Sequence, residues 1–67
     1  MDTKATMPDR VRELRKNRDL LQQQLADRAG VSMQTISNLE NGRHVPDTST
    51  LLKIAEALDV SLGDLLG

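Results

Sequence analysis

The sequence predicts a compact all-α domain of five helices, and three observations support this fold class. Its 67 residues are enough for one domain with a small core. The chain contains no Phe, Tyr or Trp, so Leu, Ile, Val, Ala and Met must fill that core, which favours close helix packing over a β-sandwich. Helix start and stop signals recur along the chain, whereas no segment shows the alternating pattern of a strand.

The first helix is predicted from its capping residues. Thr6 is a suitable N-cap, and Asp9 follows three residues later, so we expect a helix over residues 7–17. Residues 1–5 are expected to form a flexible N-terminal arm, and residues 6–67 to form the domain.

The second and third helices are separated by a short turn. A helix is predicted over residues 22–29, and Gly30 ends it, because glycine adopts the left-handed conformation after a helix at little cost. Ser32 is a suitable N-cap for a third helix that ends at Asn41, before Gly42. Two helices joined by so few residues form a tight bend.

Two further helices are expected in the last third of the chain. Pro46 prevents the third helix from continuing, and Asp47 is positioned to cap a fourth. Ser61 and Asp64 form a capping box that starts a short fifth helix. The fourth helix carries the apolar residues Leu51, Ile54, Ala55 and Leu58.

Composition and charge exclude several classes of protein. The net charge is −1, so a polybasic protein that holds nucleic acid by bulk charge is excluded. Residues 1–43 carry eight basic and six acidic side chains, which leaves room for a localised basic face. There is no cysteine and only one histidine, so we expect no metal site and no cofactor. The apolar runs are too short for a membrane span or signal peptide, and we expect a cytoplasmic protein.

The segment QQQLADRAGVSMQTISNL, residues 22–39, has the layout of a helix-turn-helix motif. Small Ala26 stands where two helices would cross closely, and Gly30 stands at the turn. Ile36 and Leu39 would anchor the second helix of the motif. No arrangement of nucleophile and base and no phosphate-binding loop is visible, so an enzyme is not expected.

This segment and its flanks resemble the Cro/C1-type domains of phage repressors and Xre-like regulators. The matching flanks are RELR at residues 12–15, ENG after the motif and LLKIAEALDVSLGDLL at residues 51–66. The resemblance covers residues 10–66. It implies a lambda-repressor-like fold whose second helix crosses the DNA backbone and whose third helix lies in the major groove. It also implies sequence-specific binding of double-stranded DNA by a bacterial or phage transcriptional regulator, most simply a repressor.

The outer face of the third helix is predicted to read bases. On a helical wheel, uncharged hydrogen-bonding side chains lie opposite Ile36 and Leu39. Gln and Asn amides match the edge of adenine, and a methionine can meet a thymine methyl. On composition alone such a face is only a solvated polar surface, but inside this motif we interpret it as base-reading. The predicted base-reading residues are Met33, Gln34, Ser37 and Asn38.

A second set of residues is predicted to contact phosphates. The resemblance implies contacts from the amide at the start of the second helix and from the loop after the third, although that loop also fits an ordinary polar loop. Helix N-termini offer free amide donors, which agrees with this role. The predicted phosphate contacts are Gln22, Thr35, Asn41, Arg43 and His44.

The resemblance further implies a partly buried salt bridge between Arg15 and Glu40, which would make both residues structural. The alternative is two separate surface charges, but Glu40 lies about 70° from the inward direction of its helix, which favours the pair. Two positions depart from the family pattern. Leu21 replaces the usual Ser or Thr before the second helix, and Met33 replaces a polar or basic residue.

Partners are predicted from the same reasoning. One small acidic domain offers few phosphate contacts, so we expect a weak homodimer on an inverted-repeat operator. Its best apolar surface is the C-terminal group Leu62, Leu65 and Leu66, although Leu65 and Leu66 also fit the alternative role of closing the core. The alternative function is an antitoxin or bridging module that uses the fold to bind protein; the low net charge supports it.

Overall fold

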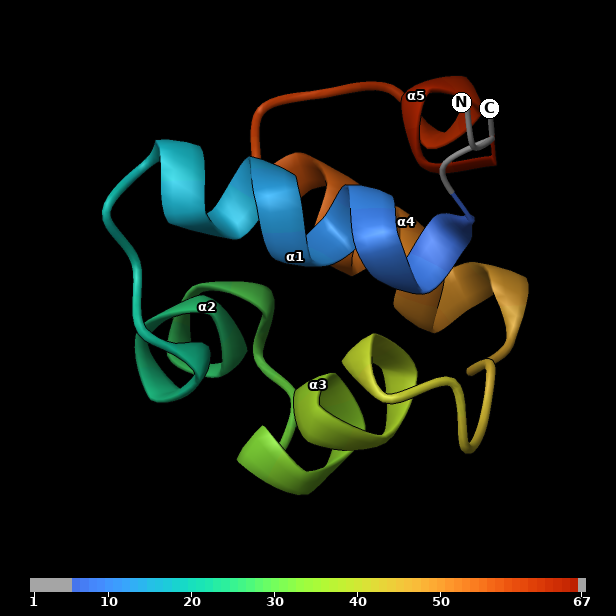
Figure 1. The fold of residues 1–67 in the computed structure, drawn as a ribbon, viewed down its shortest axis with the longest axis horizontal. Helices are drawn as coiled ribbons and strands as arrows, with labels where there is room; N and C mark the ends of the chain where they lie inside the picture. The colour runs from blue at the N-terminus through green and yellow to red at the C-terminus, as the bar shows by residue number, and fades with distance from the viewer. Residues whose placement is uncertain (1–5, 67) are drawn as a thin grey trace, which may run out of the picture.

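The computed structural model describes residues 6–66, and these form five helices with no strand among them (Figure 1). The helices are α1 (Met7–Asn17), α2 (Gln22–Ala29), α3 (Met33–Glu40), α4 (Thr48–Ala57) and α5 (Leu62–Leu66). In Figure 1, α1 crosses in front of α4, and α2 and α3 lie together below it. The predicted all-α fold of five helices is therefore confirmed.

The capping residues define the start of the helices. Thr6 and Asp9 form a capping box, in which the Asp9 N–H donates to Thr6 Oγ1 and the Thr6 N–H donates to Asp9 Oδ2, both at 3.4 Å. The predicted bounds of α1 and α2 are confirmed. The N-cap of α2 is Leu21, whose apolar side chain cannot accept a bond from the first amides of the helix. The Leu21 N–H itself donates to Gln24 Oε1 at 2.8 Å.

Four helices are followed, within two residues of their last residue, by a residue with positive φ. Gly30 (72°) and Gly42 (71°) follow α2 and α3, as the sequence indicates, but Asp19 (55°) and Asp59 (61°) take the same role after α1 and α4. In each case the next N–H donates back to a carbonyl in the last turn, for example Val31 N–H to Ala26 at 3.0 Å. The predicted end of α3 at Asn41 is one residue too late. The Asn41 backbone already departs from the helix, so that the following N–H groups can close it.

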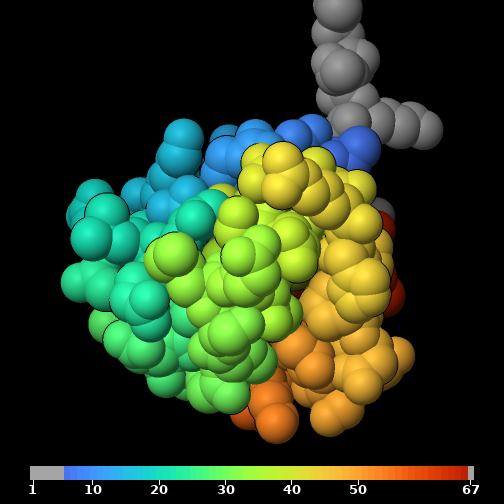
Figure 2. All heavy atoms as spheres, turned by 90° about the horizontal axis from the view of Figure 1, so that it is seen from below, coloured from blue at the N-terminus to red at the C-terminus, as the bar shows by residue number. Residues whose placement is uncertain are grey.

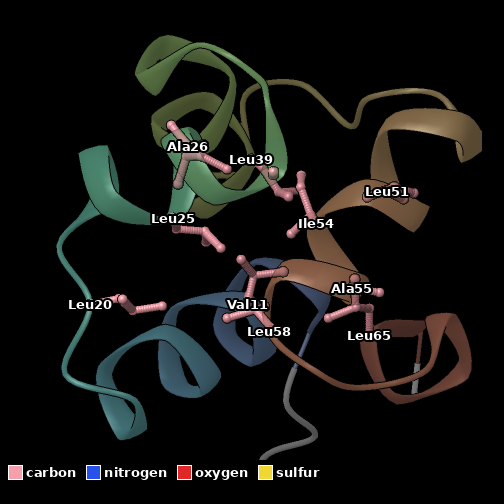
Figure 3. Close-up of a cluster of buried hydrophobic side chains, with 12 residues drawn as sticks. Val11, Leu20, Leu25, Ala26, Leu39, Leu51, Ile54, Ala55, Leu58 and Leu65 are labelled. Atoms are coloured by element: carbon pink, nitrogen blue, oxygen red, sulfur yellow. The ribbon is translucent and has the colours of Figure 1, made fainter.

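The core lies between all five helices (Figure 3). Leu65 of α5 is fully buried within it, whereas Leu66 is 60% exposed and Leu62 is partly buried against it. This corrects one prediction, because Leu65 closes the core and is not available to a second copy of the chain. The buried apolar side chains are Val11, Leu20, Leu25, Ala26, Ala29, Ile36, Leu39, Leu51, Ile54, Ala55, Leu58 and Leu65.

The N-cap of α4 makes stability depend on pH. The Thr50 N–H donates to Asp47 Oδ1 at 2.9 Å, and this bond lowers the pKa of Asp47 below its ordinary value. A lowered folded-state pKa stabilises the fold above the unfolded pKa, and this contribution is lost as pH falls through the folded value. We expect the destabilisation caused by Asp47→Ala, measured by urea unfolding, to stay constant from pH 7 to about 4 and to shrink as pH falls further, to about 2. An equal destabilisation at pH 7 and at about pH 2 would contradict this role.

Candidate functional site

The α2–α3 unit is a tight bend held by the turn between the two helices. Gly30 ends α2 at φ 72° and ψ 32°, a conformation that strains other residues. Two residues later, Ser32 Oγ accepts the Thr35 N–H at 3.1 Å and starts α3. Buried Ala26 has no bulky side chain to hold the helices apart. As a result, α3 occupies the centre of one face of the molecule, with α2 on one side and the loop 41–47 and the start of α4 on the other (Figure 2).

One face of helix α3 packs into the core, and the opposite face is accessible to solvent. Ile36 and Leu39 are fully buried, so they hold the helix in one rotation about its axis. The four predicted base-reading residues all lie on the face that this rotation leaves accessible. Met33 (45% exposed) and Gln34 are exposed, and Ser37 and Asn38 are half-buried. Gln34 Nε2 donates to Asn38 Oδ1 at 2.9 Å along this face.

A groove beside α3 brings together residues from both predicted sets. Thr35 and Asn38 line it from α3, and His44 lines it from the following loop. Thr35 Oγ1 lies 3.0 Å from Ser32 Oγ, so its hydroxyl already takes part in the cap. The complete lining is Val31, Ser32, Thr35, Asn38, His44, Pro46, Asp47 and Thr50.

The loop after α3 is tied to the helix through main-chain bonds. The Arg43 and His44 N–H groups both donate to the Asn38 carbonyl, at 2.9 and 3.4 Å. The Arg43 and His44 side chains remain exposed beside the predicted base-reading face. Asn41 is also exposed, and its Nδ2 donates to Ser37 Oγ at 3.3 Å.

Glu40 is the one buried charged residue among residues 6–66, at 2% exposure. Arg15 binds it through two bonds, Nε to Oε2 at 2.7 Å and a terminal guanidinium nitrogen to Oε1 at 3.0 Å. A further Arg15 nitrogen donates to the Leu20 carbonyl at 2.8 Å. The predicted pair thus lies in contact, and it links α1 to the end of α3.

Two residues at this junction have roles that the sequence interpretation missed. The Gln22 side chain donates to Glu40 Oε1 at 3.1 Å, and an Arg12 guanidinium nitrogen donates to the Glu40 carbonyl at 2.8 Å. The Gln22 side chain therefore points toward Glu40, and its backbone N–H, in the first position of α2, is the group left for a phosphate. The spacing of Arg12 and Arg15, three residues apart on one helix face, is the signal that could have indicated the Arg12 contact.

Other kinds of site find no support in the described part of the chain. Within residues 6–66, no three His, Cys, Asp or Glu side chains are grouped so that they could hold a metal ion. Over the same residues, no helix has the length and apolar character needed to span a membrane.

Comparison with known proteins gives a family and several close relatives. A family model described as helix-turn-helix (HTH_3) matches residues 11–65. The immunity repressor of Bacillus phage phi105 is 36% identical over 62 residues, which cover 92% of this chain. The chain spans only 43% of the length of that repressor.

Solved structures agree with this comparison. The P22 c2 repressor in complex with the synthetic operator 9T has a TM-score of 0.88 and 33% identity, over 94% of this chain and 96% of that one. The restriction-modification controller protein C.AhdI from Aeromonas hydrophila has a TM-score of 0.88 and 31% identity, over 92% and 94% of the two chains. The similarity thus extends over almost the whole of the two chains in these structures.

Proposed function

Because this chain belongs to the HTH_3 helix-turn-helix family, Cro/C1-type and Xre-like, we propose that it binds double-stranded DNA sequence-selectively and acts as a transcriptional repressor. The observation that carries the proposal is the accessible amide-bearing face of α3 on a helix held by fully buried Ile36 and Leu39. A helix fixed in this way can enter the major groove with its side chains in a defined register. The repressor acts by occupying an operator, and no chemical step is involved.

The two predicted sets of residues make different contacts with DNA. Met33, Gln34, Ser37 and Asn38 form the face that meets base edges, and together they supply specificity. Phosphate contacts come from the Gln22 backbone N–H, Thr35 and the loop residues Asn41, Arg43 and His44, and they set the orientation of the protein on the duplex. The main-chain bonds from the loop to the Asn38 carbonyl support this division, because they hold both sets at a fixed distance from each other.

A selection of bound sequences from random duplex DNA tests the proposed function. We expect enrichment of one defined sequence, with binding that weakens as salt is raised. If the folded protein enriches no sequence, the proposal is wrong, and the alternative of a protein-binding module becomes the better interpretation of the fold.

Arg43 provides a separate test of the phosphate contacts. Its exposed guanidinium adds affinity that does not depend on sequence, so Arg43→Ala should weaken binding to cognate and random duplexes by the same factor. The slope of log Kd against log salt should fall by about one. Lys53→Ala is the matched control, because it removes an exposed cation on α4 that belongs to neither predicted set, and it should leave the slope unchanged. An unchanged slope for Arg43→Ala would remove Arg43 from the phosphate set.

We further propose that binding is completed by a weak homodimer on an inverted repeat. Two-fold pairing would hold two copies of α3 about 34 Å apart, one turn of the duplex. With Leu65 in the core, Leu66 and the partly buried Leu62 are the remaining C-terminal apolar candidates for the contact. Duplexes with two half-sites about 10 base pairs apart should bind cooperatively, while sedimentation of the free protein shows mostly monomer. Equal affinity per half-site on one-site and two-site duplexes would indicate a monomeric binder.

A further inference from the structure

The hydrogen bond between Gln34 and Asn38 uses one donor of the Gln34 amide and the oxygen of the Asn38 amide. Gln34 Nε2 donates one of its two hydrogens to Asn38 Oδ1 at 2.9 Å. The Oε1 acceptor and the second N–H donor of Gln34 remain free. An acceptor and a donor side by side are the groups that match N6 and N7 of adenine in the major groove.

This bond also selects the orientation of the Gln34 amide. Gln34 is exposed, and the last torsion of a glutamine is broad and roughly two-fold, so a free side chain exchanges the positions of its oxygen and nitrogen. Asn38 presents its Oδ1 acceptor, and only the Gln34 orientation with Nε2 toward Asn38 can donate to it. With Asn38 Oδ1 as the acceptor, the bond sets the order in which Gln34 offers its acceptor and donor to a base.

Asn38 is the more buried of the two residues. Its side chain is half-buried and lines the groove beside α3, and its main-chain carbonyl accepts the Arg43 and His44 N–H groups. Gln34 lies one helical turn nearer the N-terminus of α3, the end of a recognition helix that contacts base edges. The more buried Asn38 thus lies farther from the end of α3 that would contact bases, and the exposed Gln34 lies nearer to it.

We propose that Asn38 is a positioning residue, which orients the Gln34 amide so that Gln34 reads one adenine-containing base pair. Asn38 itself reads no separate base pair. The inference rests on the proposed DNA binding and specifies how the α3 face achieves its selectivity.

Base preference at single positions tests the assignment. The selected duplex is changed one base pair at a time, and Kd is measured for wild type, Gln34→Ala, Asn38→Ala and the double variant. We expect both single variants to lose roughly tenfold discrimination at the same base pair, and the double variant to lose no more than Gln34→Ala. Loss at two different base pairs, or losses that add, would overturn the assignment.

Two further variants separate orientation from general effects on the helix. Asn38→Asp keeps the Oδ1 acceptor, so it should retain the base preference although its negative charge weakens binding to every duplex alike. A loss of preference as complete as in Asn38→Ala would count against the proposal. Gln23→Ala is the matched control, because it breaks a similar bond, Gln23 Nε2 to Asp27 Oδ1 at 2.8 Å on α2, and should leave every preference unchanged.

The outcomes also distinguish this inference from the proposed function. A wild-type protein without any base preference would overturn both. Clear preference in the wild type, with separate base pairs affected by Gln34→Ala and Asn38→Ala, would overturn the positioning role alone.

Discussion

Replacing Glu40 by alanine should lower the free energy of unfolding by about 3–5 kcal/mol, because the change leaves the Arg15 charge without its partner in a largely buried site. It also removes the acceptor of the Gln22 amide. A domain of this size has a total stability of only about 3–10 kcal/mol, so the variant should be largely unfolded at 37 °C or melt more than about 10 °C lower. Circular dichroism against temperature measures this directly.

Controls distinguish the ion pair from a general effect of losing a glutamate. Glu56→Ala removes an exposed glutamate from α4 and should change stability by less than about 0.5 kcal/mol. In a double-variant cycle, Arg15→Ala with Glu40→Ala should cost clearly less than the sum of the two single changes. Additive costs would mean that the two side chains do not interact in solution.

Leu65→Ala should cost about 2–5 kcal/mol, since the side chain is fully buried and its loss leaves a cavity beneath α5. The neighbouring leucine is the matched control. Leu66 is 60% exposed, so Leu66→Ala should leave monomer stability nearly unchanged. Urea unfolding at low protein concentration keeps dimerisation out of the comparison. If the two variants were equally stable, α5 would not close the core in the way described.

Local signals were enough to predict most of the fold. Thr6 with Asp9 and Gly30 with Ser32 determine backbone hydrogen bonds within three or four residues of themselves, so they could be recognised without tertiary information. The aspartates at positive φ could not. An aspartate such as Asp19 carries no local signal for a left-handed conformation. Only the path of the chain between α1 and α2 requires Asp19 to adopt one.

Tertiary contacts explain what the sequence did not predict at the site. Gln22 is one of three consecutive glutamines, and nothing local shows that this one donates to Glu40, eighteen residues away in the chain. Likewise, Leu65 and Leu66 are identical residues whose burial depends on how α5 lies against the other helices. The α3 face was predictable because it depends only on the helical period and on the two buried anchors, Ile36 and Leu39.

The central claim, that the accessible face of α3 reads DNA sequence, is tested most directly by the binding of Gln34→Ala to two duplexes. One duplex carries the selected sequence and the other a scrambled version of equal length. The proposal predicts that the variant loses about 1–3 kcal/mol on the selected duplex, roughly a 5- to 150-fold rise in Kd, with unchanged affinity for the scrambled one. Equal losses on both duplexes, or no loss on either, would contradict it.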